Sequence, residues 1–223
     1  MNLALFDLDH TLIPLDSDYE WGQFLTRIGA VDPVAFAQRN REFFDQYQAG
    51  TLDPVAYLEF ALGVLAQFKR EQLDEWHRQF MSEVILPAIL PAARDLVQRH
   101  RDAGDLLGIV TATNRFVTAP IAKAFGVEHL MAAEPELTAA GELTGKLDGM
   151  PTYGEGKIAH TRRWLAGMGK SLDSFERSHF YSDSHNDIPL LSAVTDPVAT
   201  NPNAKLAAHA EAHGWPILKL FND

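Results

Sequence analysis

The amino-acid sequence predicts an α/β fold: a parallel sheet with helices on both faces and an all-helical segment inserted after the first strand. Three observations predict it. Residues 3–8 form a short apolar run, which is typical of a buried strand. Residues 14–88 then show helical periodicity without a strand. From residue 91 onward, strand and helix patterns alternate as in right-handed βαβ crossovers, so the expected fold class is a Rossmann-like parallel sheet.

The inserted segment is expected to contain four helices. The dipeptide "DP" at 32–33 and again at 53–54 interrupts the apolar periodicity, because proline disfavours a helix interior. The helices are expected at about 17–29, 33–49, 53–67 and 69–83.

The alternating part of the chain begins with a helix at about 91–103. Buried-strand runs are expected at 105–111, 129–134 and 178–183, with a weak strand at 197–200 and a hairpin around Gly141 at 136–145. The remaining helices are expected at about 114–125, at 155–168, from Asn186 and at 203–213. These boundaries divide the chain into a core of residues 1–13 and 89–223 and a helical domain of residues 14–88.

The composition limits the classes of function. The chain of 223 residues is 46% hydrophobic, so it can bury a substantial core. A formal net charge of −11 argues against nucleic acid or an anionic membrane as a partner and favours small molecules. The absence of cysteine excludes disulfides, thiolate metal sites and Cys nucleophiles. With no signal-peptide pattern and no apolar stretch of about 20 residues, we expect a soluble, cytoplasmic protein, and the sequence leaves its oligomeric state open.

Two acids follow the first strand in the stretch "LALFDLDHTL". Asp7 and Asp9 come directly after a buried apolar run, where an unpaired carboxylate costs several kcal/mol of desolvation. Side chains alternate along an extended strand, so the two carboxylates are expected on the same side. A metal or a reactive group is therefore expected beside them.

Polar residues also follow two other expected strands. Thr111 and Thr113 lie after the second strand, and Asp183 lies after the strand at 178–183. In open parallel sheets the ligand site lies beyond the carboxyl ends of the strands, so these side chains are expected to converge with the first acid pair.

Four ordered motifs connect these residues. They are D-x-D-x-T at 7–11, Thr111 after an apolar run, Lys157 after "GEG", and "YSDSHND" with Asp183 and Asp187. Together they resemble the motifs of the haloacid dehalogenase-like (HAD) phosphohydrolases, and the resemblance runs from Leu3 to about Asn201. The helical insertion is similar to the C1 cap of the phosphoserine-phosphatase-like branch, subfamily IB. This resemblance makes residues 14–88 a cap domain.

The resemblance implies a phosphate-ester hydrolase with an aspartyl-phosphate intermediate. Asp7 would attack phosphorus, and Asp9 would protonate the leaving alcohol and then deprotonate the attacking water. Mg²⁺ (magnesium) is the implied cofactor, bound by Asp7, the backbone carbonyl of Asp9 and Asp183. Presence of the second aspartate favours phosphatase chemistry over the dehalogenase and P-type ATPase branches.

Further residues follow from the same motifs. Thr111, Ala112 and Lys157 would bind the phosphate, with Thr113 as the competing candidate for the role of Thr111. Asp187 and Asn186 would order the waters of the metal.

The acids of the helical segment bear on the substrate. Alignment from Asp7 puts Asp16 where the related phosphoserine phosphatases bind an ammonium group. Matching "AGTLDPVAYLEF" to the cap helix that carries their carboxylate-binding arginine puts Glu59 at the position of that arginine. With Asp18 and Glu20 in the same segment, and twelve acidic against six basic residues over 14–88, we expect a substrate with a cationic far end. Histidinol phosphate fits this description, and phosphoethanolamine or phosphocholine fit nearly as well.

Three alternatives stay open at this point. One is a phosphoserine phosphatase, and a second is a phosphotransferase that passes the phosphoryl group to another alcohol. The third belongs to a different class: a binding protein that keeps the fold without catalysis. The intact set Asp7, Asp9, Thr111, Lys157 and Asp183 argues against this third reading.

Overall fold

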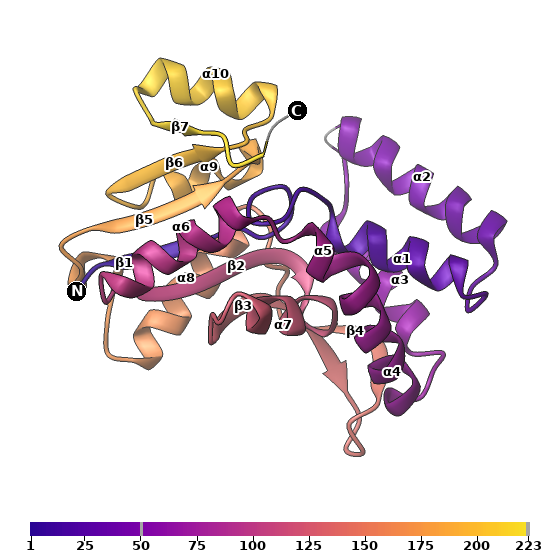
Figure 1. Cartoon of the computed structure of the whole chain (residues 1–223). Coiled ribbons are helices and arrows are strands. Elements are labelled where there is room, and N and C mark those ends of the chain that lie inside the picture. Colours follow the sequence, from indigo (N-terminus) through magenta and orange to yellow (C-terminus); the bar gives the residue numbers. More distant parts are fainter. Residues whose placement is uncertain (50, 222–223) are drawn as a thin grey trace.

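A seven-stranded sheet forms the centre of the molecule (Figure 1). The computed structural model describes residues 1–49 and 51–221; Gly50 and residues 222–223, the last two of the expected core segment 89–223, lie outside the described residues. The strand order is β4-β3-β2-β1-β5-β6-β7, and all neighbours pair in parallel except β3 and β4. The strands are β1 (Leu3–Phe6), β2 (Leu106–Asn114), β3 (His129–Leu137), β4 (Leu143–Asp148), β5 (Ser178–Ser182), β6 (Asp196–Thr200) and β7 (Ile217–Leu218). The predicted Rossmann-like parallel sheet is confirmed.

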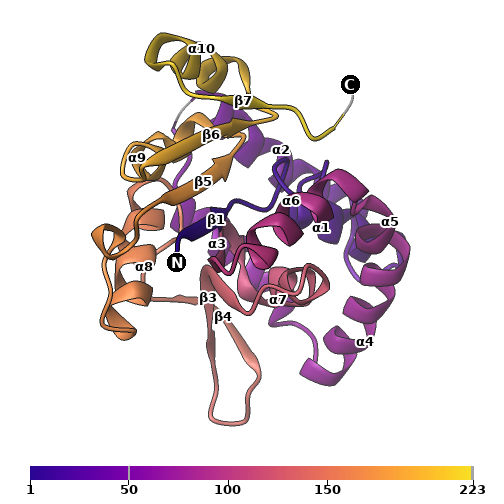
Figure 2. The ribbon, with the colours of Figure 1, turned by 60° about the vertical axis from the view of Figure 1, so that its left-hand side comes forward.

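A hydrophobic core lies on each face of the sheet, and β1 contributes to both cores because its successive side chains point to opposite sides. Ala4 and Phe6 join a core with helices α6 (Pro91–Asp102) and α7 (Arg115–Ala124). Leu3 and Leu5 join a second core on the other face. Figure 2 shows α8 and α9 on that second side of the strands and α6 and α7 on the first. The helices of the second face are α8 (Glu155–Gly167), α9 (Ile188–Leu191) and α10 (Ala204–His213).

In the described residues between β1 and α6, the named elements are all helices, joined by short loops. Its helices are α1 (Ser17–Arg27), α2 (Pro33–Ala49), α3 (Pro54–Leu65), α4 (Arg70–Phe80) and α5 (Leu86–Ala88), with a π-helical turn at Met81–Ile85. Each "DP" dipeptide begins a helix, because the aspartate side chain accepts hydrogen bonds from the first-turn main-chain N–H groups and proline occupies the first helical position. These helices lie together at one end of the sheet (Figure 1).

Two features differ from the sequence-based expectation, and a third agrees with it. Strand β2 continues to Asn114 instead of ending near residue 111, with a register shift against β3 between Val110 and Asn114. The two-residue strand β7 was not expected, since so short a run carries no periodic pattern. Strand β4, whose hairpin turn is near Gly141 as predicted, is the antiparallel edge of the sheet.

Among the described residues, no helix combines the length and apolar character that crossing a membrane requires.

Candidate active site

A cavity of about 360 Å³ lies at the carboxyl ends of the central strands, where they meet the inserted helices. The residues of the sheet side that line it follow β1 or β5, lie in the last part of β2, or lie at or just before the start of α8: Asp7, Asp9, His10, Thr111, Ala112, Thr113, Tyr153, Lys157, Asp183, Ser184, Asn186 and Asp187. The helical segment contributes Asp16, Asp18, Asn40, Phe43, Leu52, Pro54, Tyr57 and Leu58. The motif residues named from the sequence therefore meet in one cavity.

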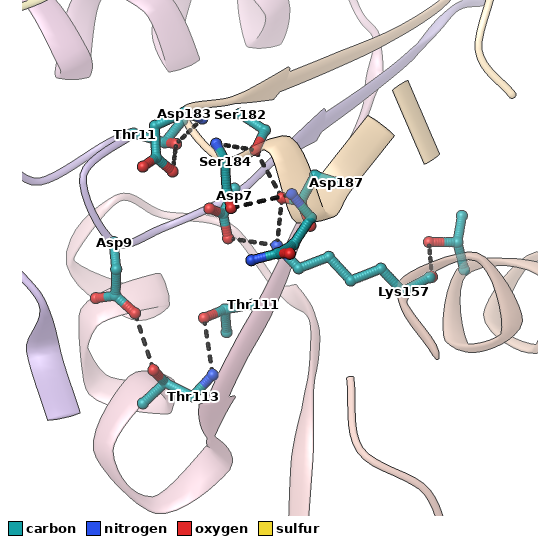
Figure 3. A network of polar contacts seen from close by, with 12 residues as sticks. Asp7, Asp9, Thr11, Thr111, Thr113, Lys157, Ser182, Asp183, Ser184 and Asp187 are labelled. Atoms are coloured by element: carbon teal, nitrogen blue, oxygen red, sulfur yellow. Dashed lines mark hydrogen bonds and ion pairs between the residues drawn. The ribbon is translucent and has the colours of Figure 1, made fainter. Parts of the chain in front are cut away.

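Lys157 lies between two buried carboxylates (Figure 3). Its Nζ donates to Asp7 Oδ1 over 2.8 Å and to Asp187 Oδ2 over 2.6 Å. Asp187 Oδ2 also accepts from Ser182 Oγ over 2.6 Å. Burial lowers the pKa of Lys157, but the charges of Asp187 and Asp7 outweigh it and raise the pKa above its ordinary value. Lys157 therefore carries a permanent positive charge beside Asp7.

The sequence "GEG" places Lys157 at the start of α8. Gly154 adopts a positive φ of 53° just before the helix, a conformation that glycine tolerates best. At Gly156, a Cβ atom would lie 2.1 Å from the carbonyl oxygen of Pro151, so only glycine allows the chain to approach this closely. The two glycines thus let the helix begin where its lysine reaches Asp7.

Asp183 is held by Thr11, the last residue of the first motif. The main-chain N–H of Asp183 donates to Thr11 Oγ1 over 3.0 Å, and Thr11 Oγ1 lies 3.2 Å from Asp183 Oδ1. Burial, with the charges of Asp7 and Asp187, raises the pKa of Asp183 to about 8. The acids are thus crowded in a way that a bound cation would relieve.

The donor set suits a magnesium ion. Asp7 and Asp183 offer carboxylate oxygens, and in the described residues no three His, Cys, Asp or Glu side chains group as a metal site. A cation bound by these two carboxylates would complete its coordination with further oxygen donors and water. An oxygen-only, partly hydrated shell of this kind is what Mg²⁺ prefers.

The carboxylate of Asp9 is held at both oxygens. The main-chain N–H of Ser17 donates to Oδ1 over 2.8 Å, and Thr113 Oγ1 donates to Oδ2 over 2.9 Å. Burial, followed by the charges of Asp16 and Asp7, raises the pKa of Asp9 to about 8. A carboxyl group with this pKa holds a proton readily near neutrality, as a general acid must.

The two threonines near the end of β2 have different surroundings. Thr111 Oγ1 accepts from the main-chain N–H of Thr113 over 3.2 Å, while the hydroxyl of Thr113 is directed at Asp9 (Figure 3). Both residues are buried and both line the cavity. The hydroxyl of Thr113 therefore has a carboxylate partner, Asp9, whereas that of Thr111 accepts from the main chain.

Of the four acids expected to select the substrate, two line the cavity. Asp16 caps α1 and Asp18 lies in its first turn. Asp18 accepts hydrogen bonds from Tyr57 Oη over 2.6 Å and from Asn114 Nδ2 over 3.3 Å, and burial raises its pKa to about 6.

Glu20 and Glu59 are not among the residues that line the cavity, which corrects the expectation for both. Glu59 is exposed on α3. Successive residues of a helix turn by about 100°, and here Tyr57 and Leu58 take the cavity-facing positions. The sequence analysis did not identify Tyr57 and Asn40 as cavity residues, because they belong to no motif. Their polar groups, a phenol hydroxyl and an amide, are the only signal in the sequence that could have suggested them.

Comparison with known proteins identifies the family. The sequence model of the haloacid dehalogenase-like hydrolases matches residues 4–192. A histidinol-phosphatase of Neisseria meningitidis serogroup C (strain 8013) is 45% identical over 219 residues, covering 98% of this chain and 99% of that protein. The phosphoserine phosphatase SerB1 of Mycobacterium tuberculosis (strain ATCC 25618 / H37Rv) is 32% identical and covers 96% of this chain and 69% of that protein.

Solved structures agree at the level of the fold. A protein of unknown function from Bordetella pertussis Tohama I superposes with a TM-score of 0.95 at 51% identity, over 99% of both chains. A substrate-bound phosphoserine phosphatase superposes with a TM-score of 0.68 at 15% identity, over 97% of this chain and 91% of that one. The resemblance carried by the four motifs is confirmed. The chain belongs to the haloacid dehalogenase-like hydrolases, and it is a phosphatase of that family.

Proposed function

We propose that this phosphatase hydrolyses histidinol phosphate through an aspartyl-phosphate formed on Asp7, with Mg²⁺ as its cofactor. The similarity to the Neisseria histidinol-phosphatase over nearly the full length of both chains supports the substrate. The residues that line the cavity support it independently, as described next.

The charge of the cavity wall is the observation that supports histidinol phosphate as the substrate. Among the described residues that line the cavity, Lys157 is the only Lys or Arg, and it is already bound by Asp7 and Asp187. The helical segment contributes Asp16 and Asp18 to the same cavity wall. A substrate carboxylate about 4 Å from one of these acids would be repelled by about 4 kcal/mol at an intermediate dielectric. Histidinol phosphate has an amine and an imidazole and no carboxylate, whereas phosphoserine has a carboxylate.

The first chemical step transfers the phosphoryl group to the protein. A carboxylate oxygen of Asp7 attacks phosphorus, and the bond between phosphorus and the ester oxygen breaks. Asp9 gives its proton to that oxygen, so histidinol leaves with a neutral hydroxyl group instead of an alkoxide. Lys157 holds the other side of Asp7 through Oδ1 and keeps the nucleophile oriented.

The second step returns Asp7 to its free form. Asp9, now a carboxylate, takes a proton from a water molecule, and the water oxygen attacks phosphorus. The bond between phosphorus and the Asp7 oxygen breaks, which releases inorganic phosphate and the free Asp7 carboxylate. The hydroxyl of Thr111, the main-chain N–H of Ala112 and the ammonium of Lys157 bind the phosphoryl oxygens in both steps.

The magnesium ion would be held by Asp7, Asp183 and the backbone carbonyl of Asp9, with Asp187 and Asn186 ordering its waters. When bound, it supplies positive charge that offsets the repulsion between the Asp7 carboxylate and the phosphate dianion.

We infer that residues 14–88 act as a cap domain on the core of residues 1–13 and 89–223. We also propose a cytoplasmic enzyme whose partners are small phosphate esters, without nucleic acid or membrane, since it has no cysteine and a net charge of −11.

A phosphate-release assay with Mg²⁺ tests the substrate. Histidinol phosphate, phosphoserine and phosphoethanolamine are compared, and kcat/KM is expected to be highest for histidinol phosphate. Asp18→Asn is expected to raise KM for histidinol phosphate about tenfold, because it removes about 1.4 kcal/mol of attraction for the cationic end. Glu59→Gln, which neutralises an acid outside the cavity, is the matched control and should leave KM unchanged.

Two results would overturn the proposal. Phosphoserine as the best substrate would refute the argument from the cavity wall, and hydrolysis by Asp7→Asn would refute the mechanism. Adding other alcohols to the same assay separates hydrolysis from transfer. Hydrolysis predicts that the phosphate released equals the substrate consumed.

A further inference from the structure

Each oxygen of the Asp9 carboxylate accepts a hydrogen bond from a different part of the chain. The Ser17 main-chain N–H, at the start of α1, donates to Oδ1, and the Thr113 hydroxyl, at the end of β2, donates to Oδ2. Figure 3 shows the hydroxyl of Thr113 directed at Asp9 from the side of the sheet. Thr113 is only 9% exposed, so bulk water competes weakly for this contact.

These two hydrogen bonds fix the orientation of the Asp9 carboxylate, which would otherwise rotate easily about its terminal torsion. The terminal torsion of aspartate joins an sp³ to an sp² carbon and has broad, shallow wells. A carboxylate with one donor can rotate about this bond, whereas donors on both oxygens define its plane. The Ser17 contact comes from the backbone, so the Thr113 hydroxyl is the contact that side-chain substitution can remove.

Thr113 is itself tied to the phosphate side of the cavity. Its main-chain N–H donates to Thr111 Oγ1 over 3.2 Å, and Thr111 is the proposed phosphate-binding hydroxyl. The irregular end of β2, with its register shift between Val110 and Asn114, presents both threonines to the cavity. Two consecutive hydrogen bonds therefore connect Thr111, the proposed phosphate-binding residue, through Thr113 to the Asp9 carboxylate.

We infer that Thr113 is a positioning residue that holds the Asp9 carboxyl in line with the ester oxygen of the substrate. This rests on the proposed acid–base role of Asp9. Thr113 does not touch the phosphate; it acts through Asp9, and a misplacement of about 1 Å of a reacting group costs on the order of 100-fold in rate. Loss of its hydroxyl is therefore expected to impair proton transfer specifically.

Leaving-group dependence tests this role. An alkoxide leaves only when it receives a proton, whereas p-nitrophenolate leaves without one. We compare kcat/KM for p-nitrophenyl phosphate and for the best alkyl phosphate of the panel above, so the test holds whichever alkyl ester that is. In Thr113→Val, kcat/KM is expected to fall about 30-fold for the alkyl ester and less than about threefold for the aryl ester.

The second step provides a separate readout. Because Asp9 also activates the attacking water, breakdown of the aspartyl-phosphate is expected to become slow in Thr113→Val. Rapid mixing with p-nitrophenyl phosphate should then show a burst of p-nitrophenolate, about one equivalent per active site, followed by slow turnover. Thr113→Ser, which keeps the hydroxyl, is expected to restore both readouts to within about threefold of the unchanged protein.

Three further variants complete the design. Asp9→Asn removes the proton donor itself, so it should discriminate between the esters in the same direction and by a larger factor. Thr118→Val removes a buried hydroxyl that bonds the carbonyl of Asn114, away from Asp9, and should show no discrimination. Thr113→Ala replaces Thr113→Val if valine disturbs folding, which thermal unfolding would reveal.

The outcomes separate this inference from the proposed function. If Asp9→Asn discriminates between the esters and Thr113→Val does not, the positioning role is refuted and the mechanism survives. If Asp9→Asn does not discriminate, the acid–base role of Asp9 fails and the positioning role fails with it. An equal loss in Thr113→Val and Thr113→Ser would also refute the inference, because it would trace the effect to packing.

Discussion

Replacing Lys157 by methionine should destabilise the protein more than any single exposed charge can. Lys157 Nζ lies 2.8 Å from Asp7 Oδ1 and 2.6 Å from Asp187 Oδ2, and all three side chains are less than 10% exposed. Methionine keeps most of the apolar stem but leaves two buried carboxylates without their cation. Removing one partner of a buried ion pair costs about 3–5 kcal/mol. For a chain of this size that corresponds to a fall in Tm of about 10 °C.

Urea unfolding at neutral pH, in EDTA so that metal does not compensate, measures this cost. Lys205→Met is the matched control, because Lys205 is exposed and the substitution changes the net charge equally; its free energy of unfolding should stay within about 0.5 kcal/mol of the parent. Adding Asp187→Asn to Lys157→Met removes one of the stranded carboxylates and should recover part of the loss. A free energy of unfolding for Lys157→Met within about 1 kcal/mol of the parent would refute the reasoning.

Three further predictions follow from the same site and its surroundings. Mg²⁺ at 100 times its Kd should stabilise the fold by about 2.7 kcal/mol, seen as a higher Tm, and Asp183→Asn should abolish the shift because a proposed ligand is lost. Burial lowers the pKa of His77, so the folded state resists its protonation and stability should fall as the pH drops below the ordinary value of 6.5. His77→Gln should flatten that slope in urea titrations between pH 7 and 5.5; an unchanged slope would contradict it. Gly156→Ala places a methyl group against the Pro151 carbonyl and should lower both kcat and the free energy of unfolding, the latter by more than about 2 kcal/mol. Full activity and stability in that variant would show that the start of α8 can shift without cost.

Much of the fold was predictable because its signals are local. The "DP" dipeptides mark helix starts through contacts within three residues, as the hydrogen bonds of Asp32 and Asp53 show. The apolar run of β1 predicts burial on both faces, and Leu3, Ala4, Leu5 and Phe6 are each fully buried. Strand β7 and the extension of β2 to Asn114 were missed because they depend on pairing with distant strands.

The candidate site divides in the same way. Asp7, Asp9, Thr111, Lys157 and Asp183 were named from their places at expected strand and helix ends and from the order of their motifs, and the structure brings all five to one cavity. Their order along the chain is a property of the sequence. This order can be recognised without knowing which side chains contact each other in the fold.

The tertiary structure alone decided the partners of these residues. Lys157 bonds Asp7 across 150 residues, and Asp18 bonds Tyr57 across 39. Glu59 was expected to line the cavity, but Tyr57 and Leu58 on the same helix line it instead. The face that a helix turns toward the cavity depends on how the helix packs, which the sequence does not show. The sequence by itself determined which chemical groups exist and near which strand ends they lie, because strand and helix periodicity act over a few residues. Which of those groups touch was left to packing between elements far apart in the chain.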